Sequence, residues 1–225
     1  MINKFRLKFG SKVAVLPVIH VQTLKQTQKN VRIVKRAGCT GMFLIGHGIN
    51  EESFYIIQNT IALENPELWI GVNYLWFSAK DAAEQMVNNM PRTNGLWTDQ
   101  ANISNHGLAT ETYAKAKNFM YFGGVDFKYQ TPEKDKRAAA KLATHYMDVI
   151  CTSGVGTGHA PNVGKIIAMK EAVGDFPIAI ASGITPENAN MFLGYADCFM
   201  VATGISQDFQ TLDQSKLEAL LKTVA

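Results

Sequence analysis

The chain has 225 residues, of which 47% are hydrophobic and 18% are charged, a composition typical of a globular protein with room for a large core. Its 22 Lys and Arg residues against 19 Asp and Glu residues give a formal net charge of +3, and because the basic residues are scattered we expect no nucleic-acid partner. No apolar run reaches the roughly 18 residues that a membrane span needs, and the polar first residues lack the apolar centre of a secretion signal, so we expect a cytoplasmic protein without membrane insertion.

Short apolar runs rich in β-branched or aromatic residues alternate along the chain with longer segments of helical period. The runs begin every roughly 22 to 29 residues, the spacing expected of repeated strand and helix units. The expected strands are 13–21, 41–46, 68–75, 95–99, 119–127, 148–152, 177–181 and 198–203.

Helix signals fall between these runs. Ser78, Thr131 and Thr185 each stand where a hydroxyl side chain starts a helix, and the leucines of 215–224 recur at helical spacing. The fourth unit is the weakest, because the polar stretch 102–109 leaves room only for a short helix around 111–117. We predict that 102–109 is a long loop on the catalytic face.

The strands are nearly all apolar, as in 178–181, which is typical of parallel strands covered by helices on both faces. An open doubly wound sheet is one solution for such strands, but eight equivalent units with no leftover segment favour a closed barrel. We therefore predict a single (β/α)8 TIM barrel over residues 1–225, with the helix 215–224 packed across the first and last strands. A homo-oligomer formed through helix faces is left open.

In such a barrel the active site is built from the carboxyl ends of the strands. Asp126 and Lys128 follow the fifth expected strand two positions apart, so on an extended strand they lie on the same side. We expect an ion pair in the pocket, with Asp126 as general base or acid and Lys128 as an electrostatic stabiliser. A purely structural ion pair at the barrel mouth is the alternative.

Asp99 ends the fourth expected strand and is expected to be a second catalytic carboxylate, since neighbouring strands would bring it close to Asp126. Such a pair can share a proton or a divalent cation, with His20 as a further ligand. The spacing is not that of a metal motif, so we predict no metal and no other cofactor, and keep a divalent cation as the less favoured alternative. His20 and Asn73 are expected to orient the substrate.

The glycine-rich loop after the sixth expected strand begins with Thr152, Ser153 and Gly154. It resembles a dinucleotide-binding loop only superficially, because no acidic residue follows at the next strand end to hold a ribose. Its glycines and hydroxyls suit contact with a phosphate or carboxylate. A flexible lid that touches no ligand is the alternative.

The loops after the seventh and eighth expected strands each combine a small hydroxyl residue with a glycine. Barrels of this kind frequently bind phosphate at this place through backbone N–H groups. We predict a phosphate site formed by Ser182, Gly183, Thr203 and Gly204. Glycines that merely make tight turns are the alternative.

The three cysteines, Cys39, Cys151 and Cys198, lie far apart and in or beside apolar runs. This pattern indicates buried thiols in a reducing compartment and argues against a disulfide framework or a thiolate zinc site. No base is placed by the sequence to activate Cys151, so we expect it to be packed as a small apolar group.

Several segments together carry a family likeness. The runs 148–162 (DVICTSGVGTGHAPN), 180–189 (IASGITPENA) and 196–205 (ADCFMVATGI) resemble, in order and spacing, the loops of the BtpA family, and 17–20, 71–73, 98–100 and 126–128 fit its earlier motifs. The resemblance implies a (β/α)8 barrel of the ribulose-phosphate-binding kind. It also implies a link to the biogenesis of photosynthetic membrane complexes, from which the family takes its name.

Two functions from different classes follow. The first is a cytoplasmic enzyme, an isomerase or lyase, that acts on a small phosphorylated metabolite by acid and base chemistry without a redox cofactor. The second is a non-catalytic assembly or biogenesis factor that binds an anion or a protein partner. A deep pocket with titrating carboxylates favours the enzyme, and a filled barrel mouth with a large exposed apolar patch favours the binding protein.

Overall fold

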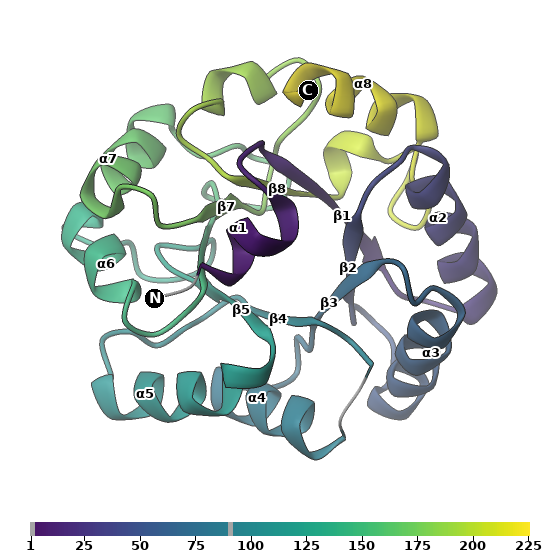
Figure 1. The fold of residues 1–225 in the computed structure, drawn as a ribbon, viewed down its shortest axis with the longest axis horizontal. Coiled ribbons are helices and arrows are strands. Elements are labelled where there is room, and N and C mark those ends of the chain that lie inside the picture. Colours follow the sequence, from purple (N-terminus) through teal and green to yellow (C-terminus); the bar gives the residue numbers. More distant parts are fainter. Residues whose placement is uncertain (1–2, 90–91) are drawn as a thin grey trace.

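A computed structural model describes residues 3–89 and 92–225 of the chain. Eight parallel strands close into a barrel in which each strand pairs with the next and β8 pairs with β1, so the predicted (β/α)8 fold is confirmed (Figure 1). The strands are β1 (Ala14–His20), β2 (Gly41–Ile45), β3 (Trp69–Asn73), β4 (Gly95–Thr98), β5 (Met120–Gly124), β6 (Val149–Thr152), β7 (Ile178–Ile180) and β8 (Cys198–Val201).

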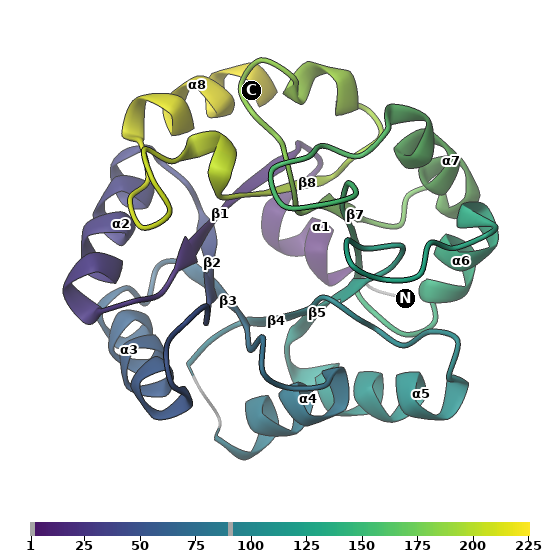
Figure 2. The same ribbon diagram turned by 180° about the vertical axis from the view of Figure 1, so that it is seen from behind.

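Helices form a ring around the strands in both views (Figures 1 and 2). The ring consists of α2 (Leu24–Arg36), α3 (Glu51–Glu64), α4 (Ala79–Asn88), α5 (His106–Lys115), α6 (Lys136–Ala143), α7 (Val163–Val173) and α8 (Gln214–Val224), and α1 (Lys4–Phe9) lies inside it at one end of the barrel. Short 3-10 helices η1 (Ala116–Asn118), η2 (Ala189–Phe192) and η3 (Thr203–Ile205) complete the connections. The predicted last helix is confirmed, and it packs against η2, η3 and α2.

Side-chain caps explain where most helices begin. Ser78 accepts a hydrogen bond from the N–H of Asp81 and caps α4, as predicted. The predicted start at Thr131 is wrong, because Asp135 caps α6 by accepting bonds from the N–H groups of Arg137 and Ala138. The N–H of Glu133, which a cap at Thr131 would use, donates to Asp126 Oδ1 instead, so α6 begins later.

Two further differences from the predicted helices concern the segments after β4 and β7. Helix α5 begins at His106, earlier than predicted, because Asn105 accepts a hydrogen bond from the N–H of Leu108. The predicted long loop is therefore shorter than 102–109. After β7 the expected helix at Thr185 is reduced to η2, where the Asn188 side chain accepts from the N–H of Thr185 and donates to the carbonyl of Gly183. These local bonds hold a turn instead of a regular helix.

The core has two layers. One lies between the strands and the surrounding helices, and the other fills the barrel interior with side chains that include Phe43, Trp97 and Phe122. Phe43 and Phe122 meet edge to face, with ring centroids 5.1 Å apart. The interior is therefore packed, and the cavities described below lie toward the carboxyl ends of the strands.

The short helix α1 lies across the amino-terminal opening of the barrel (Figure 1). Phe5 is fully buried there and meets Phe122 of the interior layer. Lys4 pairs with Asp148, and Arg6 pairs with Asp197. Helix α1 thus closes this end, and the loops at the carboxyl ends of the strands, nearer the viewer in Figure 2, surround the other end.

Candidate functional site

Asp99 follows β4 directly and lies beside Asn73, the last residue of β3. The Asn73 amide donates to Asp99 Oδ1 over 3.0 Å, and the Gln130 amide donates to the Asp99 carbonyl. Burial raises the pKa of the Asp99 carboxyl, although the hydrogen bond from Asn73 and the charge of Lys128 act in the opposite direction. Asp99 is therefore a partly buried carboxyl that holds its proton more firmly than an exposed aspartate does.

A cavity of about 500 Å³ opens beside this carboxyl at the mouth of the barrel. Its lining includes Asn73, Tyr74, Asp99, Lys128 and Gln130. The side of the mouth next to β3, β4 and β5 is thus not filled by side chains, and a pocket beside a carboxyl is one of the features that favours an enzyme over a binding protein.

Lys128 connects this cavity to two others, because it lines all three. Its ammonium lies 3.4 Å from Thr157 Oγ1 and 5.6 Å from the centroid of the Phe127 ring. None of the ion pairs found in residues 3–89 and 92–225 involves Lys128. The cation is therefore available to a ligand.

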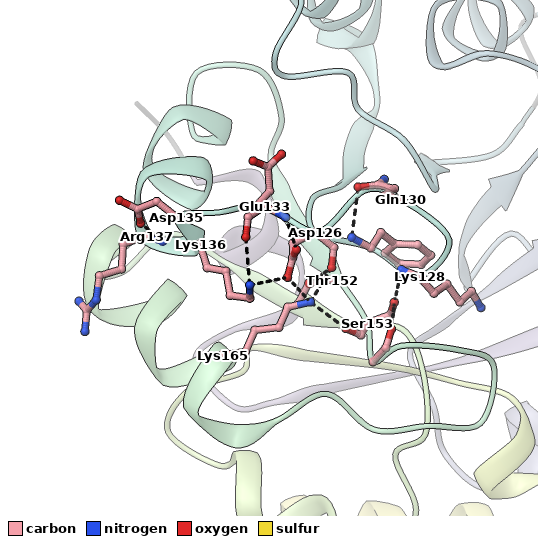
Figure 3. Close-up of polar contacts among 12 residues, drawn as sticks. Asp126, Lys128, Gln130, Glu133, Asp135, Lys136, Arg137, Thr152, Ser153 and Lys165 are labelled. Atoms are coloured by element: carbon pink, nitrogen blue, oxygen red, sulfur yellow. Dashed lines mark hydrogen bonds and ion pairs between the residues drawn. The ribbon is translucent and has the colours of Figure 1, made fainter.

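Asp126, one strand further, is placed quite differently (Figure 3). Its Oδ2 lies 2.8 Å from Lys165 Nζ and 3.8 Å from Lys136 Nζ, and its Oδ1 accepts from the N–H of Glu133 over 2.8 Å. Burial alone would raise the pKa of Asp126, but the bonds from Lys165 and Glu133 and the charges of the two lysines outweigh burial and lower it. Asp126 is held as an ionised carboxylate with both oxygens occupied.

The predicted ion pair between Asp126 and Lys128 is wrong. Strand β5 ends at Gly124, and Asp126 adopts a left-handed conformation with φ of +46°, so the alternation of an extended strand does not apply. Figure 3 shows the Lys128 side chain extending away from Asp126. Sequence reasoning missed Lys165, since a lysine in the first turn of α7 carries no signal that it reaches back to β5.

Thr152 and Ser153 are fully buried. Thr152 Oγ1 donates to the Asp126 carbonyl over 3.2 Å, and Ser153 Oγ accepts from the N–H of Lys128 over 2.7 Å and donates to the Gly154 carbonyl. A Cβ on Gly154 would stand 2.2 Å from the His159 carbonyl oxygen. These residues join the loops after β5 and β6, and their predicted contact with a ligand stays a prediction.

The loops after β7 and β8 meet around a small cavity of about 50 Å³. Its lining includes the four residues predicted to hold phosphate, Ser182, Gly183, Thr203 and Gly204, together with His20 and Lys128. The Ser182 hydroxyl donates to the Gly156 carbonyl over 3.1 Å. In the described part of the chain the N–H groups of Gly183 and Ile184 donate to no backbone or side-chain acceptor, and Gly183, but not Ile184, is among the residues that line the cavity.

Both glycines are required by their surroundings. Gly183 has φ of +65°, and a Cβ there would stand 2.0 Å from the backbone nitrogen of Ala160. A Cβ on Gly204 would stand 1.9 Å from the carbonyl oxygen of Ile184. The three loops that follow β6, β7 and β8 therefore touch one another through their backbones.

His20, at the end of β1, is covered by an aromatic side chain. Its ring stacks on Phe209 with centroids 4.2 Å apart, and His47 meets it edge on at 5.9 Å. Burial, followed by the charge of His47, lowers the pKa of His20 to about 4. His20 is therefore a neutral imidazole at physiological pH.

The cysteines are free and buried, as predicted, and burial raises the pKa of Cys39 to about 12. In the described ranges no group of three or more His, Cys, Asp and Glu side chains is arranged to hold a metal ion. Nor does any helix of residues 3–89 and 92–225 have the length and apolar character to cross a membrane.

The sequence pattern of the BtpA family matches residues 67–225, most of the site included. The chain belongs to the BtpA family. An uncharacterised protein of Thermococcus kodakarensis is 28% identical over 166 residues, which cover 69% of this chain and 63% of that protein. An uncharacterised protein of Pyrococcus horikoshii is 27% identical over 75 residues, 33% of this chain and 29% of its own length. The chain thus spans less than two thirds of the length of each of these relatives.

Solved structures share the fold of this BtpA-family chain. Phosphoribosyl anthranilate isomerase from Thermus thermophilus superposes with a TM-score of 0.66 at 13% identity, covering 92% of this chain and 97% of that one. A geranylgeranylglyceryl phosphate synthase from Thermoplasma acidophilum gives 0.71 at 14% identity, covering 98% and 96%. A thiamine phosphate pyrophosphorylase from Pyrococcus furiosus gives 0.69 at 18% identity, covering 95% and 96%.

Proposed function

We propose that this protein is an enzyme that transfers a proton on a small phosphorylated metabolite at the mouth of the barrel. The observation that carries the proposal is the position of Lys128, which lines both the cavity beside Asp99 and the glycine-bounded cavity of the β7 and β8 loops. One small molecule can therefore place its phosphate at the loops and its reacting carbon near Asp99.

The roles follow from the contacts. Asp99 is the general acid or base, because its pKa is raised and it faces open space. Asn73 orients it through the 3.0 Å hydrogen bond, and Lys128 stabilises negative charge that develops on the substrate. This chemistry, an isomerisation or a lyase reaction, needs no redox cofactor.

The phosphate is bound by the N–H of Gly183, which lines the cavity and donates to no acceptor in the described part of the chain, with Lys128 supplying positive charge. Solved structures with a similar fold support this choice of ligand. The isomerase, the synthase and the pyrophosphorylase are each named for a phosphorylated compound. Asp126 takes no part in proton transfer in this scheme, because both its oxygens are occupied.

The test begins with ligand binding. A thermal-shift screen against inorganic phosphate and phosphorylated three- to six-carbon metabolites should give stabilising ligands, since a ligand at about 100 times its dissociation constant adds roughly 2.7 kcal/mol to the folded state. Failure of every phosphate compound to stabilise the protein would overturn the proposal.

Turnover of each ligand is then followed by NMR. Asp99→Asn should bind the ligand and lose turnover, because the amide keeps the shape and cannot exchange the proton. The exposed Asp175→Asn is the matched control and should keep full activity. An Asp99→Asn enzyme that still turns over would remove Asp99 from the mechanism.

A further inference from the structure

One polar atom inside the barrel is left without a partner. Trp97, in β4, is 3% exposed and packs edge to face against Phe43 and Phe127, with centroids 5.8 and 6.0 Å away. Its indole nitrogen is buried and forms no hydrogen bond with any group in the described ranges. Because indole can only donate, an acceptor must come from outside these side chains.

A buried donor without a partner costs the free energy that water would have supplied, so such atoms are rare and call for an explanation. Three other side chains, Tyr55, Gln58 and Trp76, also hold an unpaired buried atom. They lie on α3 and in the loop after β3, within an aromatic cluster around Phe54 and Tyr74. Trp97 differs from them by its position at the candidate site.

Trp97 lines the small cavity that Gly183, Gly204 and Lys128 also line. At about 50 Å³ this cavity exceeds the roughly 10–15 Å³ that one water needs, so it has room for a few non-hydrogen atoms. The Lys128 ammonium, the N–H of Gly183 and the Trp97 indole can each donate a hydrogen bond and cannot accept one. The cavity therefore suits a group rich in acceptor oxygens.

We propose that Trp97 is a substrate-binding residue whose indole N–H donates to an oxygen carried by the carbon chain of the ligand, next to its phosphate. This inference rests on the proposed phosphate site. It narrows the ligand class to phosphomonoesters with a hydroxyl or carbonyl oxygen close to the phosphate, because a bare alkyl chain would leave the indole N–H unpaired.

The size of the cavity selects a short probe pair. Glycerol phosphate and propyl phosphate have the same three-carbon chain and differ in two hydroxyl groups, and inorganic phosphate tests the anion site alone. Titration calorimetry should show that the wild-type protein binds glycerol phosphate at least about fivefold more tightly than propyl phosphate. Equal affinities for the two esters would overturn the inference.

Two matched variants locate the effect. Trp97→Phe keeps an aromatic ring and removes the N–H, so it should abolish the preference for glycerol phosphate and leave the affinity for inorganic phosphate unchanged. Trp76→Phe removes an equally unpaired indole N–H away from the cavity and should keep the preference. A Trp97→Phe protein that retains the preference would overturn the inference.

A measurement on the unaltered chain covers the case in which Trp97→Phe does not fold. The protein has three tryptophans, so its indole N–H resonances are few, and Trp69→Phe and Trp76→Phe assign them by elimination. Saturating glycerol phosphate should shift the Trp97 resonance more than propyl phosphate does. A Trp97 resonance that responds equally to both esters means that a trapped water, and not the ligand, accepts the hydrogen bond from the indole N–H. The inference then fails.

These outcomes separate the inference from the function on which it rests. If inorganic phosphate and both esters leave the wild-type protein unaffected, the phosphate site itself is absent and the proposed function fails. If all three bind and the Trp97 results are negative, the phosphate site stands and only the role of Trp97 is removed.

Discussion

The carboxyl ends of β4 and β5 are neighbours in the sheet, and each is followed by an aspartate, yet the two side chains live in opposite surroundings. Asp126 is clamped by Lys165, Lys136 and the N–H of Glu133 (Figure 3). Asp99 receives one side-chain hydrogen bond, from Asn73, and borders a cavity of about 500 Å³. The pKa of the first carboxyl is lowered and that of the second is raised.

The comparison shows that the hydrogen-bond and ion-pair partners of a carboxylate, more than its position on a strand, determine whether it can exchange a proton. A carboxylate whose lone pairs are all engaged holds loops together, and one that is partly desolvated and open on one side can exchange a proton. We therefore regard the β5 end as the structural corner of the barrel mouth and the β4 end as its reactive side. The following substitutions test that division.

The largest expected effect is on the structural corner. Asp126→Ala leaves the ammonium of Lys165, whose side chain is 11% exposed, with the carbonyl oxygens of residues 126 and 153 but without its carboxylate partner, and should cost about 3–5 kcal/mol of unfolding free energy in urea denaturation. The exposed Asp175→Ala is the control and should change stability by less than about 0.5 kcal/mol. A loss below about 1 kcal/mol at Asp126 would show that the clamp is not structural.

The next effect is a pH dependence at the end of β1. Folding lowers the pKa of His20 from 6.5 to about 4, so the neutral imidazole contributes stability that is present above pH 6.5 and is lost as the pH falls toward 4. The loss amounts to about 2 to 3 kcal/mol. Denaturation at pH 7 and pH 4 should show a smaller difference for His20→Gln than for the wild-type protein, and an unchanged difference would contradict the buried neutral state.

A third substitution tests the loop after β7. Gly183→Ala places a Cβ 2.0 Å from the Ala160 backbone in a conformation with φ of +65°, so it should weaken inorganic phosphate binding at least about tenfold, or 1.4 kcal/mol, and also lower the melting temperature. Gly174→Ala is the matched control, since its φ is +59° and its Cβ would meet no atom within 4 Å. It should cost only the backbone strain of about 1–2 kcal/mol and leave binding intact.

The smallest effect on stability is expected at Asp99, and it has the opposite sign. Because folding raises the pKa of this carboxyl, the stability that its protonated form provides is present at acid pH and is lost as the pH rises through the folded-state value. Asp99→Asn should therefore melt at a higher temperature than the wild-type protein at pH 7, with the gain disappearing toward pH 4. A lower melting temperature at pH 7 would contradict the cost of the buried charge.

The sequence was sufficient for the barrel, because eight apolar runs at near-regular spacing leave few other ways to bury parallel strands. It was also sufficient to predict that Asn73, Asp99 and Lys128 lie at the same mouth, since all three stand at or after the carboxyl ends of strands that meet there. What it could not supply was the partner of Asp126. That depends on the turn at φ of +46° and on Lys165 reaching back from α7, and neither has a local sequence signal.

The absence of a local sequence signal also explains the wrong prediction of a helix start outside the site. Helix α6 starts after Asp135 and not after Thr131, because the N–H of Glu133, which a Thr131 cap would use, donates to Asp126 Oδ1 instead. Patterns of period and burial predict elements well, while caps, turns and long-range ion pairs are decided by tertiary contacts.

Helix α1 has a consequence for the order in which the chain assembles. Arg6 pairs with Asp197, 191 positions later, and Lys4 pairs with Asp148, 144 positions later. During synthesis this segment leaves the ribosome long before β8 exists, so Phe5 has no complete site to enter until the ring of strands has closed. The part of the barrel that is made early is thus among the last to reach its final contacts, and a chain arrested before residue 197 would carry Phe5 exposed to water.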